Sequence, residues 1–269
     1  MTMGMTLLRT LVIVMLSLPM AATAVQQYGF RIIDQKPQAR ENFVQGLEIL
    51  DGYLYVSTGN YGESHLLRYR FEDGELDVAR KLNRRIFAEG LTVLGDRVYQ
   101  LTWRNRMVLV YNREDLQASH WFAIPGEGWG LTNNGDNLIY SDGSDKLHFV
   151  SPRTEKILHS IRVTEAGRPV TRLNELEWIN GKIWANIWHS DRLVIIDPAT
   201  GEIEASVDLQ GLLPDSERRT GTDVLNGIAH NPADGSLWVT GKRWPWLYRI
   251  ELVPSSNTTE QEQARPISR

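Results

Sequence analysis

The sequence predicts an all-β protein, a five-bladed β-propeller. One short motif occurs five times: a lead-in residue enters an apolar strand, a Gly-rich or Asn-rich bend follows, and a second apolar strand ends at a polar or aromatic residue. The second residues of the copies are 44, 40, 45 and 52 positions apart, at Gly46, Gly90, Gly130, Glu175 and Gly227. A period of about 40 to 50 residues is typical of repeat architectures.

The five copies span residues 45–59, 89–103, 129–143, 174–188 and 226–242. A further β-rich run follows each copy, over residues 65–71, 106–111, 146–150, 192–196 and 246–252. With one outer strand after each run, every unit becomes a four-stranded antiparallel sheet that buries its faces only by stacking on the next unit. A β-sandwich with coincidental similarity is the alternative, but the recurring internal order argues against it.

The last copy runs nearly to the end of the chain and leaves no room for a clear fourth strand. Residues 28–34 (YGFRIID) precede the first copy. We therefore expect residues 28–34 to close the ring as the outer strand of the last blade. The propeller would then be a single domain, residues 25–253.

The two ends of the chain are expected to lie outside the propeller. Arg9 precedes an apolar stretch at residues 11–18, and Ala22 and Ala24 supply the small residues of a signal-peptidase site, which predicts a signal peptide over residues 1–24. An uncleaved membrane anchor is the alternative, although the stretch is short for a span of about 20 residues. The expected destination is periplasmic or secreted. Residues 254–269 are polar without periodicity, which predicts a disordered tail.

Composition excludes several classes of partner. The chain has 269 residues, a formal net charge of −4 and no cysteine. Nothing in this balance indicates a nucleic-acid footprint or a polybasic membrane patch, so we expect neither nucleic acid nor, after signal cleavage, a membrane as a partner. Without disulfides, the ring must close through strand pairing and packing. We expect a monomer.

Strand geometry brings ten residues to one end of the central channel. The first strand of each blade lines the channel and the second runs antiparallel to it, so the start of the first strand and the end of the second share a face. The ten residues at these places are Gln45, Glu89, Trp129, Asn174 and Asn226, and Gly59, Trp103, Gly143, Trp188 and Lys242. They differ from blade to blade on a constant scaffold, which indicates a site for a small ligand.

The residue types suggest what that ligand is. Tryptophan walls suit an apolar or cationic guest, a carboxylate such as Glu89 can move protons, and carboxamides can orient an amide. Taken singly, each Trp could merely pack between blades, and Glu89 could form a salt bridge to Lys242 or to a nearby Arg. The ten positions together favour a ligand site.

Metal and hydrolase chemistry receive little support. The six histidines show no HxxxH or HExxH spacing and no cysteine can complete a zinc site, so we expect no metal and no cofactor. The GxSxG motif of a hydrolase is also missing. Residues 133–136 and 142–145 carry oxygens that could hold calcium, but the same residues are typical of hairpin turns.

Seven segments along the chain resemble the glutaminyl-peptide cyclotransferases of the plant and bacterial type. They are residues 42–48 (NFVQGLE), 57–64 (STGNYGES), 87–92 (FAEGLT), 127–132 (EGWGLT), 173–178 (LNELEW), 184–188 (WANIW) and 239–245 (VTGKRWP). The resemblance covers roughly residues 43–252. It implies a five-bladed propeller that converts the N-terminal glutamine of peptides or proteins to pyroglutamate and releases ammonia. The animal enzymes of the same activity have an unrelated α/β fold and bind zinc, so the resemblance implies a metal-independent enzyme.

The resemblance also implies roles for individual residues. Glu89 corresponds to the catalytic carboxylate, for which we expect a proton-shuttling role, and Lys242, Asn174 or an indole N–H could stabilise the oxyanion. The remaining residues correspond to substrate-binding positions: Gln45, Trp103, Trp129, Trp188, Phe43 and Phe87. Arg243 and Trp246 make the last motif less regular, so the rim of the site, where the body of a peptide substrate would rest, could differ from that of the family.

Two other functions remain open from the sequence. One is a non-catalytic exported propeller that binds a ligand or a protein partner with the same ring of residues. The other is a metal-dependent propeller enzyme, such as a lactonase or lyase.

Overall fold

Strands account for nearly all the regular structure of the protein. The computed structural model describes residues 25–255, and within that range it holds 22 β-strands, one 3-10 helix, η1 (Asp215–Glu217), and no α-helix. The predicted signal peptide and nearly all of the predicted tail lie outside the described residues. No helix within residues 25–255 is long and apolar enough to cross a membrane. The all-β class is confirmed.

Three antiparallel sheets of four strands follow one another along the chain, each with its strands paired in chain order. The first sheet holds β2 (Val44–Leu50), β3 (Tyr53–Thr58), β4 (His65–Arg70) and β5 (Leu76–Lys81). The second holds β6 (Ala88–Leu94), β7 (Arg97–Thr102), β8 (Met107–Asn112) and β9 (Ala118–Ala123). The third holds β10 (Leu131–Asn133), β11 (Leu138–Ser141), β12 (Lys146–Ser151) and β13 (Lys156–Arg162). A hairpin of β14 (Thr164–Glu165) and β15 (Arg168–Pro169) comes next.

The rest of the described chain forms one eight-stranded sheet with two parts. One part holds β16 (Leu173–Ile179), β17 (Lys182–Ile187), β18 (Arg192–Ile196) and β19 (Ile203–Asp208). The other holds β20 (Leu225–Asn231), β21 (Ser236–Gly241), β22 (Trp246–Pro254) and the N-terminal strand β1 (Gln26–Pro37). β1 joins the parts, because it pairs with β22 on one side and with β19 on the other.

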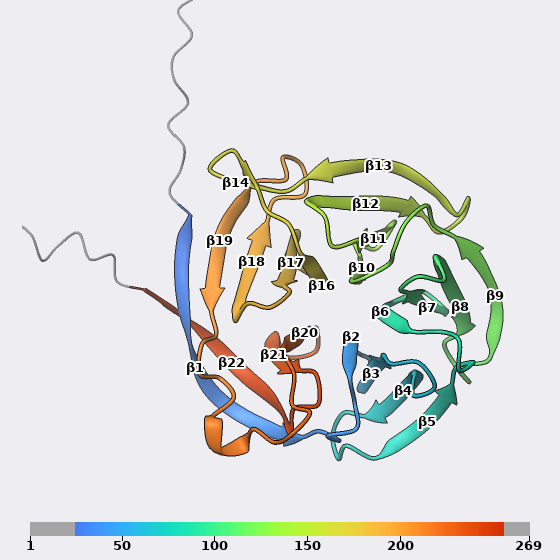
Figure 1. Cartoon of the computed structure of the whole chain (residues 1–269), viewed down its shortest axis with the longest axis horizontal. Helices are drawn as coiled ribbons and strands as arrows, with labels where there is room; N and C mark the ends of the chain where they lie inside the picture. Colours follow the sequence, from blue (N-terminus) through green and yellow to red (C-terminus); the bar gives the residue numbers. More distant parts are fainter. Residues whose placement is uncertain (1–24, 256–269) are drawn as a thin grey trace, which may run out of the picture.

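The first strand of every repeat lies at the centre of the molecule (Figure 1). Each of β2, β6, β10, β16 and β20 contacts the next, and β20 contacts β2, so these five strands form a closed ring. Hydrophobic side chains fill the space between neighbouring sheets; Leu101 and Val108 of the second sheet, for example, pack with Leu131 and Tyr140 of the third. The arrangement is propeller-like, as the repeat spacing predicts.

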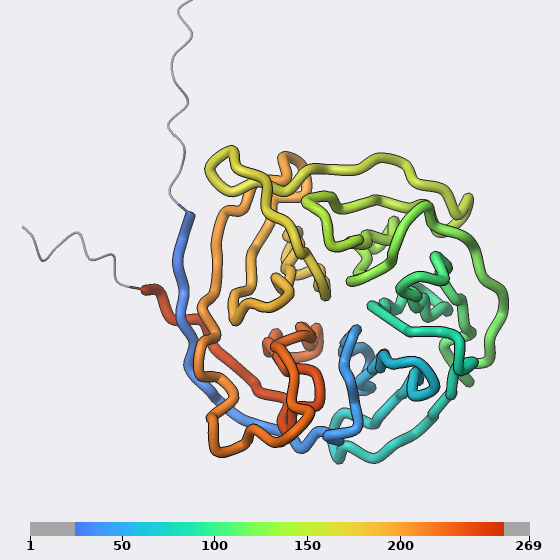
Figure 2. Tube along the Cα trace, in the orientation of Figure 1, coloured from blue at the N-terminus to red at the C-terminus, as the bar shows by residue number. Residues whose placement is uncertain are grey.

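The N-terminal strand lies where the sequence places it but is longer than predicted. β1 pairs antiparallel with β22 from Tyr28 opposite Pro254 to Pro37 opposite Trp246, with a bulge after Ile32. The two ends of the described chain therefore lie side by side at the outer edge (Figure 2). The parallel pairing of residues 26–28 with β19 was not expected; it occurs where β1 reaches and passes the end of β22, whose last residue, Pro254, lies opposite Tyr28. β22 ends at Pro254, one residue past the predicted domain boundary.

The second residue of each repeat shows how tightly the inner strands pack. A Cβ atom on Gly90 would lie 2.4 Å from the backbone nitrogen of Leu131, and one on Gly130 would lie 1.8 Å from the carbonyl oxygen of Asn174. Real Cβ atoms do not approach other atoms this closely, so the repeat needs glycine at these places. Glu175 occupies the equivalent position in the fourth repeat, and its side chain is fully buried.

Candidate active site

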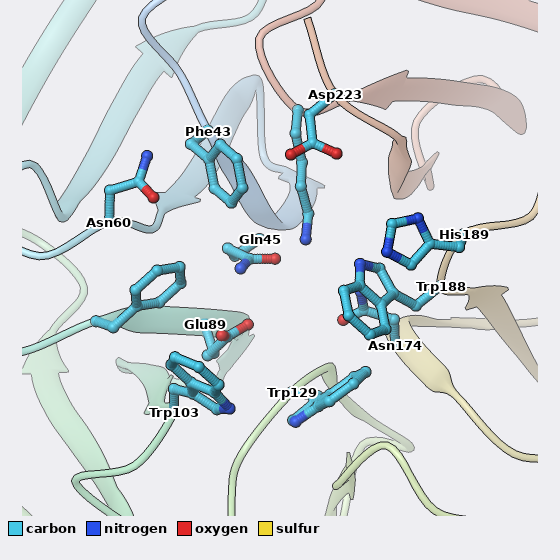
Figure 3. A pocket seen from close by; sticks show the side chains of 12 residues that line it. Phe43, Gln45, Asn60, Glu89, Trp103, Trp129, Asn174, Trp188, His189 and Asp223 are labelled. Atoms are coloured by element: carbon cyan, nitrogen blue, oxygen red, sulfur yellow. The ribbon is translucent and has the colours of Figure 1, made fainter. Parts of the chain in front are cut away.

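A cavity of about 400 Å³ opens at the end of the channel that the repeat geometry predicts (Figure 3). All nine site residues named from the sequence line it: Phe43, Gln45, Phe87, Glu89, Trp103, Trp129, Asn174, Trp188 and Lys242. Gln45, Glu89 and Asn174 are on the inner strands β2, β6 and β16. Trp103, Trp188 and Lys242 each follow directly on the end of a second strand. The antiparallel order of first and second strands is therefore what brings these residues together.

Aromatic rings form two walls of the cavity. Phe87 packs edge-to-face against Phe43, with ring centroids 6.2 Å apart, and against Trp103 at 5.5 Å. Trp129 and Trp188 make a second edge-to-face pair at 5.4 Å and 88°. Edge-to-face contacts of this kind fix the orientation of each ring and leave indole faces available to a guest.

Two glycines of the predicted ring make room for these aromatic walls. A Cβ atom on Gly59 would lie 2.4 Å from the ring of Phe87, and one on Gly143 would lie 2.7 Å from the indole of Trp129. The glycines do not line the cavity themselves. Their contribution is to let an aromatic side chain approach the backbone closely: Phe87 of the next repeat at Gly59, and Trp129 of the same repeat at Gly143.

Glu89 presents a buried carboxylate to the cavity. Its side chain lies near the middle of the site, with Trp103 and Trp129 beside it (Figure 3), and the residue is only 6% exposed. Burial raises the pKa of Glu89 well above its ordinary value; the charge of Lys242 opposes this rise and that of Glu127 adds to it. Among the described residues Glu89 forms no salt bridge to Lys242 or to an arginine, so Lys242 acts on it through its field alone.

Lys242 is a buried cation on the opposite side of the same site. The residue is 4% exposed, and its Nζ lies 5.0 Å from the centroid of the Phe43 ring, where a cation–π interaction stabilises it. Burial lowers the pKa of Lys242, while the negative charges of Glu89 and Asp223 raise it. Burial thus shifts the pKa values of the acid and of the base toward each other, which favours proton exchange in this site.

Buried carboxamides lie beneath the aromatic walls. Asn226 donates from Nδ2 to the carbonyl oxygen of Val44 at 3.0 Å and to Oε1 of Gln45 at 3.4 Å, and so orients Gln45. Oδ1 of Asn174 is buried and accepts no hydrogen bond from the described residues. Buried polar atoms are normally paired, so this oxygen is an exception among the polar groups that surround the cavity.

Three lining residues were not predicted: Asn60, His189 and Asp223. Asn60 and His189 come directly after Gly59 and Trp188 in the sequence, so extending each predicted second strand by one residue would have found them. Both have left-handed backbone conformations, with φ of 83° and 61°. Asp223 lies in the loop before β20, where no repeat position marks it; its N–H donates to the carbonyl oxygen of Lys242 at 3.1 Å.

The oxygen-rich segments weighed as calcium sites form turns. Asn134 Oδ1 accepts the backbone N–H groups of Asp136 and Asn137, and Asp142 Oδ1 accepts that of Ser144. Within residues 25–255 no group of three or more His, Cys, Asp or Glu side chains is arranged to hold a metal ion.

The cavity combines features that suit a small cationic or amide-bearing ligand. Its walls are indole and phenyl rings, a carboxylic acid and an ammonium group are buried in it, and a carboxamide oxygen is free among the described residues. Such a site can move a proton between itself and a ligand nitrogen while it restricts the access of water.

Comparisons with known proteins agree with this geometry. The chain is 36% identical over 241 residues to the glutaminyl-peptide cyclotransferase of Arabidopsis thaliana, covering 86% of this chain and 75% of the relative. The crystal structure of Myxococcus xanthus glutaminyl cyclase superposes with a TM-score of 0.80 at 35% identity, over 86% of this chain and all of that one. The WD40 β-propeller domain of Doa1 shares the fold alone, with a TM-score of 0.50 at 10% identity over 80% of this chain and 64% of that one. A sequence model of the glutamine cyclotransferase family matches residues 6–252. The chain therefore belongs to the glutamine cyclotransferase family.

Proposed function

We propose that this protein is a glutaminyl-peptide cyclotransferase, which converts the N-terminal glutamine of peptides or proteins to pyroglutamate and releases ammonia. The observation that carries the proposal is the buried Glu89 carboxylate, which faces a cavity walled by Trp103, Trp129 and Trp188. The names of its relatives in Arabidopsis and Myxococcus support the same activity.

The reaction joins two groups of a single substrate residue. The α-amino nitrogen attacks the side-chain carboxamide carbon, a five-membered lactam forms, and the carboxamide nitrogen leaves as ammonia. Counted from the neutral amine, one N–H proton is lost and the leaving nitrogen gains one, so no co-reactant is needed. A protonated amine gives up one proton more, which leaves with ammonia as ammonium. Holding the curled conformer between indole rings replaces a search through many rotamers, which supplies much of the acceleration.

Glu89 is suited to carry that proton. A free α-amino group has a pKa of about 7.7 to 8.0, so much of it is protonated at neutral pH and cannot attack. Because burial raises the pKa of Glu89, its carboxylate is a stronger base than an exposed glutamate and can accept the proton. The resulting acid can then protonate the departing nitrogen.

Lys242 is the best-placed group to stabilise the tetrahedral oxyanion, with Asn174 Nδ2 as a second donor. The indole N–H groups of Trp103 and Trp129 are already donated to Glu127, at 2.7 and 3.1 Å, which leaves Trp188 as the indole that could donate to the oxyanion. A buried ammonium acts strongly on a developing negative charge because little water screens it. Since Glu89 and Lys242 together supply the proton transfer and the charge stabilisation, we propose that the reaction needs no metal.

The finer organisation of the protein follows the same proposal. The joined eight-stranded sheet counts as two blades, so that the ring has five. The apolar stretch at residues 11–18 and the small residues before position 25 support export to the periplasm or the medium. Peptides or proteins with an N-terminal glutamine would be the substrates of a monomeric enzyme.

Ammonia release from a dipeptide that begins with glutamine tests the function. The purified protein and the Glu89→Gln variant are assayed with and without a chelator, and circular dichroism checks that both are folded. We expect release by the wild type in both buffers and none by the variant. Release that survives Glu89→Gln would remove Glu89 from the mechanism, and release abolished by the chelator would indicate a metal-dependent enzyme. A folded wild type that releases no ammonia would favour a binding propeller.

A further inference from the structure

One carboxylate outside the cavity contacts two of its walls. Glu127 lies in the loop between β9 and β10, and its Oε2 accepts hydrogen bonds from Nε1 of Trp103 at 2.7 Å and from Nε1 of Trp129 at 3.1 Å. The two tryptophans belong to different sheets, so a single oxygen atom ties neighbouring repeats together at the rim.

The loop that carries Glu127 is held against the same wall. The N–H of Gly128 points toward the carbonyl oxygens of Thr102 and Trp103, at 3.3 and 3.4 Å. A Cβ atom on Gly128 would lie 2.9 Å from the side chain of Leu101 and 3.0 Å from the carbonyl oxygen of Thr102. This close packing sets where the carboxylate of Glu127 lies.

Arg104 completes the group on the solvent side. Its guanidinium lies 4.0 Å from the centroid of the Trp103 ring, and its Nε is 3.6 Å from Oε1 of Glu127. Trp103 is therefore held by a hydrogen bond at its edge and a cation over its face. Hydrogen bonds to a charged carboxylate are stronger than neutral ones, so the loss of Glu127 would remove the polar anchor that the two indoles share.

We propose that Glu127 is a positioning residue of this site: it holds Trp103 and Trp129 in the orientation that receives the substrate's N-terminal residue, and it places a negative charge beside Glu89. The inference rests on the proposed function, because it assigns a role within the same site. Glu127 does not itself line the cavity.

The charge of Glu127 is one of several that surround Glu89. Lys242 follows β21 and acts in the opposite direction, Asp223 lies before β20, His189 follows β17, and Arg104 partly offsets Glu127. Within this set Glu127 raises the pKa of Glu89. Removing its charge while keeping an acceptor oxygen therefore separates the electrostatic role from the mechanical one.

Two variants make that separation. Glu127→Gln keeps an oxygen that can accept an indole N–H but is neutral, so we expect a KM near that of the wild type and a movement of the acidic limb of the kcat/KM profile to lower pH. Glu127→Ala removes the acceptor as well, so we expect kcat/KM to fall about tenfold to a hundredfold, mainly through KM, because misplaced binding groups cost rates of this order. Glu114→Gln, at an exposed turn between β8 and β9, is the matched control and should leave KM and the acidic limb of the kcat/KM profile unchanged.

Near-ultraviolet circular dichroism of the ligand-free proteins gives a readout that does not depend on turnover. We expect the tryptophan signal to change in Glu127→Ala, to change little in Glu127→Gln and to stay unchanged in Glu114→Gln. Glu127→Ala with wild-type kcat/KM and wild-type dichroism would overturn the inference. So would equal losses in both Glu127 variants with an unmoved acidic limb, since that would be a purely structural effect. If the wild type released no ammonia, the dichroism would still decide whether Glu127 orients the indoles, separately from the proposed function.

Discussion

The carboxylate of Glu175 accepts a hydrogen bond of 2.9 Å from the backbone N–H of Ile228, which lies on the next inner strand. Its other oxygen accepts the N–H of Leu47 at 3.2 Å, so one side chain crosses the channel between two strands. Glu177 accepts the N–H of His230 at 2.8 Å, and Glu48 accepts that of Val93 at 3.0 Å. These three buried carboxylates tie β2, β6, β16 and β20 together at the centre of the ring.

This arrangement predicts that stability falls as the pH rises above about 5. Burial raises the pKa of Glu175 and Glu177 well above the ordinary value and that of Glu48 to about 7. The folded protein therefore binds more protons than the unfolded chain from about pH 4.5 upward. Between its pKa in the unfolded chain and its pKa in the folded protein, each group lowers the free energy of unfolding by up to about 1.4 kcal/mol for each unit by which the pH rises.

Urea unfolding of the wild type and of Glu48→Gln between pH 5 and 8 measures this effect. Gln keeps an acceptor for Val93 but does not titrate, so the variant should lose less stability than the wild type as the pH rises toward 7. Comparing the two proteins cancels groups that titrate in both, such as His230, whose pKa burial lowers. A stability difference that stays constant from pH 5 to 8 would contradict the prediction.

Lys242→Met should shift the pH dependence of catalysis in the direction opposite to Glu127→Gln. The charge of Lys242 lowers the pKa of Glu89, so its removal raises that pKa further and moves the acidic limb of kcat/KM to higher pH. Loss of the oxyanion partner should also lower kcat by about a hundredfold or more. Lys146→Met, at an exposed site on β12, controls for the change in net charge. An unchanged acidic limb would show that the charge of Lys242 does not influence the pKa of Glu89.

The sequence was sufficient for the ring and for most of the cavity because both follow from strand order. The spacing of the five repeats and antiparallel strand geometry place Glu89, Trp129 and Lys242 on one face without knowledge of any loop. Strand order does not predict the roles of loop residues. Asp223 and Glu127 occupy no repeat position, and Glu127 is connected to its two indoles only by proximity in the folded structure.

The sequence also does not predict the buried carboxylates or the joining of two four-stranded parts into one sheet. Glu175 reaches the N–H of Leu47, 128 positions away; it replaces a repeat glycine in the sequence, but only the fold shows which backbone groups it contacts. The parallel pairing of β1 with β19 involves residues 26–28, mostly outside the predicted closing strand 28–34, whose composition does not indicate a second partner strand.

Gly143→Ala should weaken substrate binding without unfolding the protein. The new Cβ would meet the Trp129 indole at 2.7 Å, and the indole, a side chain, gives way more readily than the backbone of the turn. Gly135→Ala is a matched control: its φ of 91° is as unfavourable for alanine as the 79° of Gly143, but its Cβ would meet no atom within 4 Å. We expect KM to rise about tenfold in Gly143→Ala alone. Equal KM values in the two variants would show that Trp129 is not placed by this glycine.

Gly90→Ala should destabilise the whole ring, because its Cβ would lie 2.4 Å from the backbone nitrogen of Leu131 and no side-chain rotation can relieve that contact. Gly90 does not have a positive φ, so the effect is steric rather than conformational. Overpacking typically costs about 1–3 kcal/mol, and we expect the upper end here because only backbone can move. Gly29→Ala on β1 is the control, since its Cβ would meet nothing within 4 Å. Denaturant midpoints measure both variants, and we expect a large fall for Gly90→Ala only. Equal midpoints would mean that the inner strands can separate, and the close backbone contact between β6 and β10 would then not be what holds neighbouring repeats together.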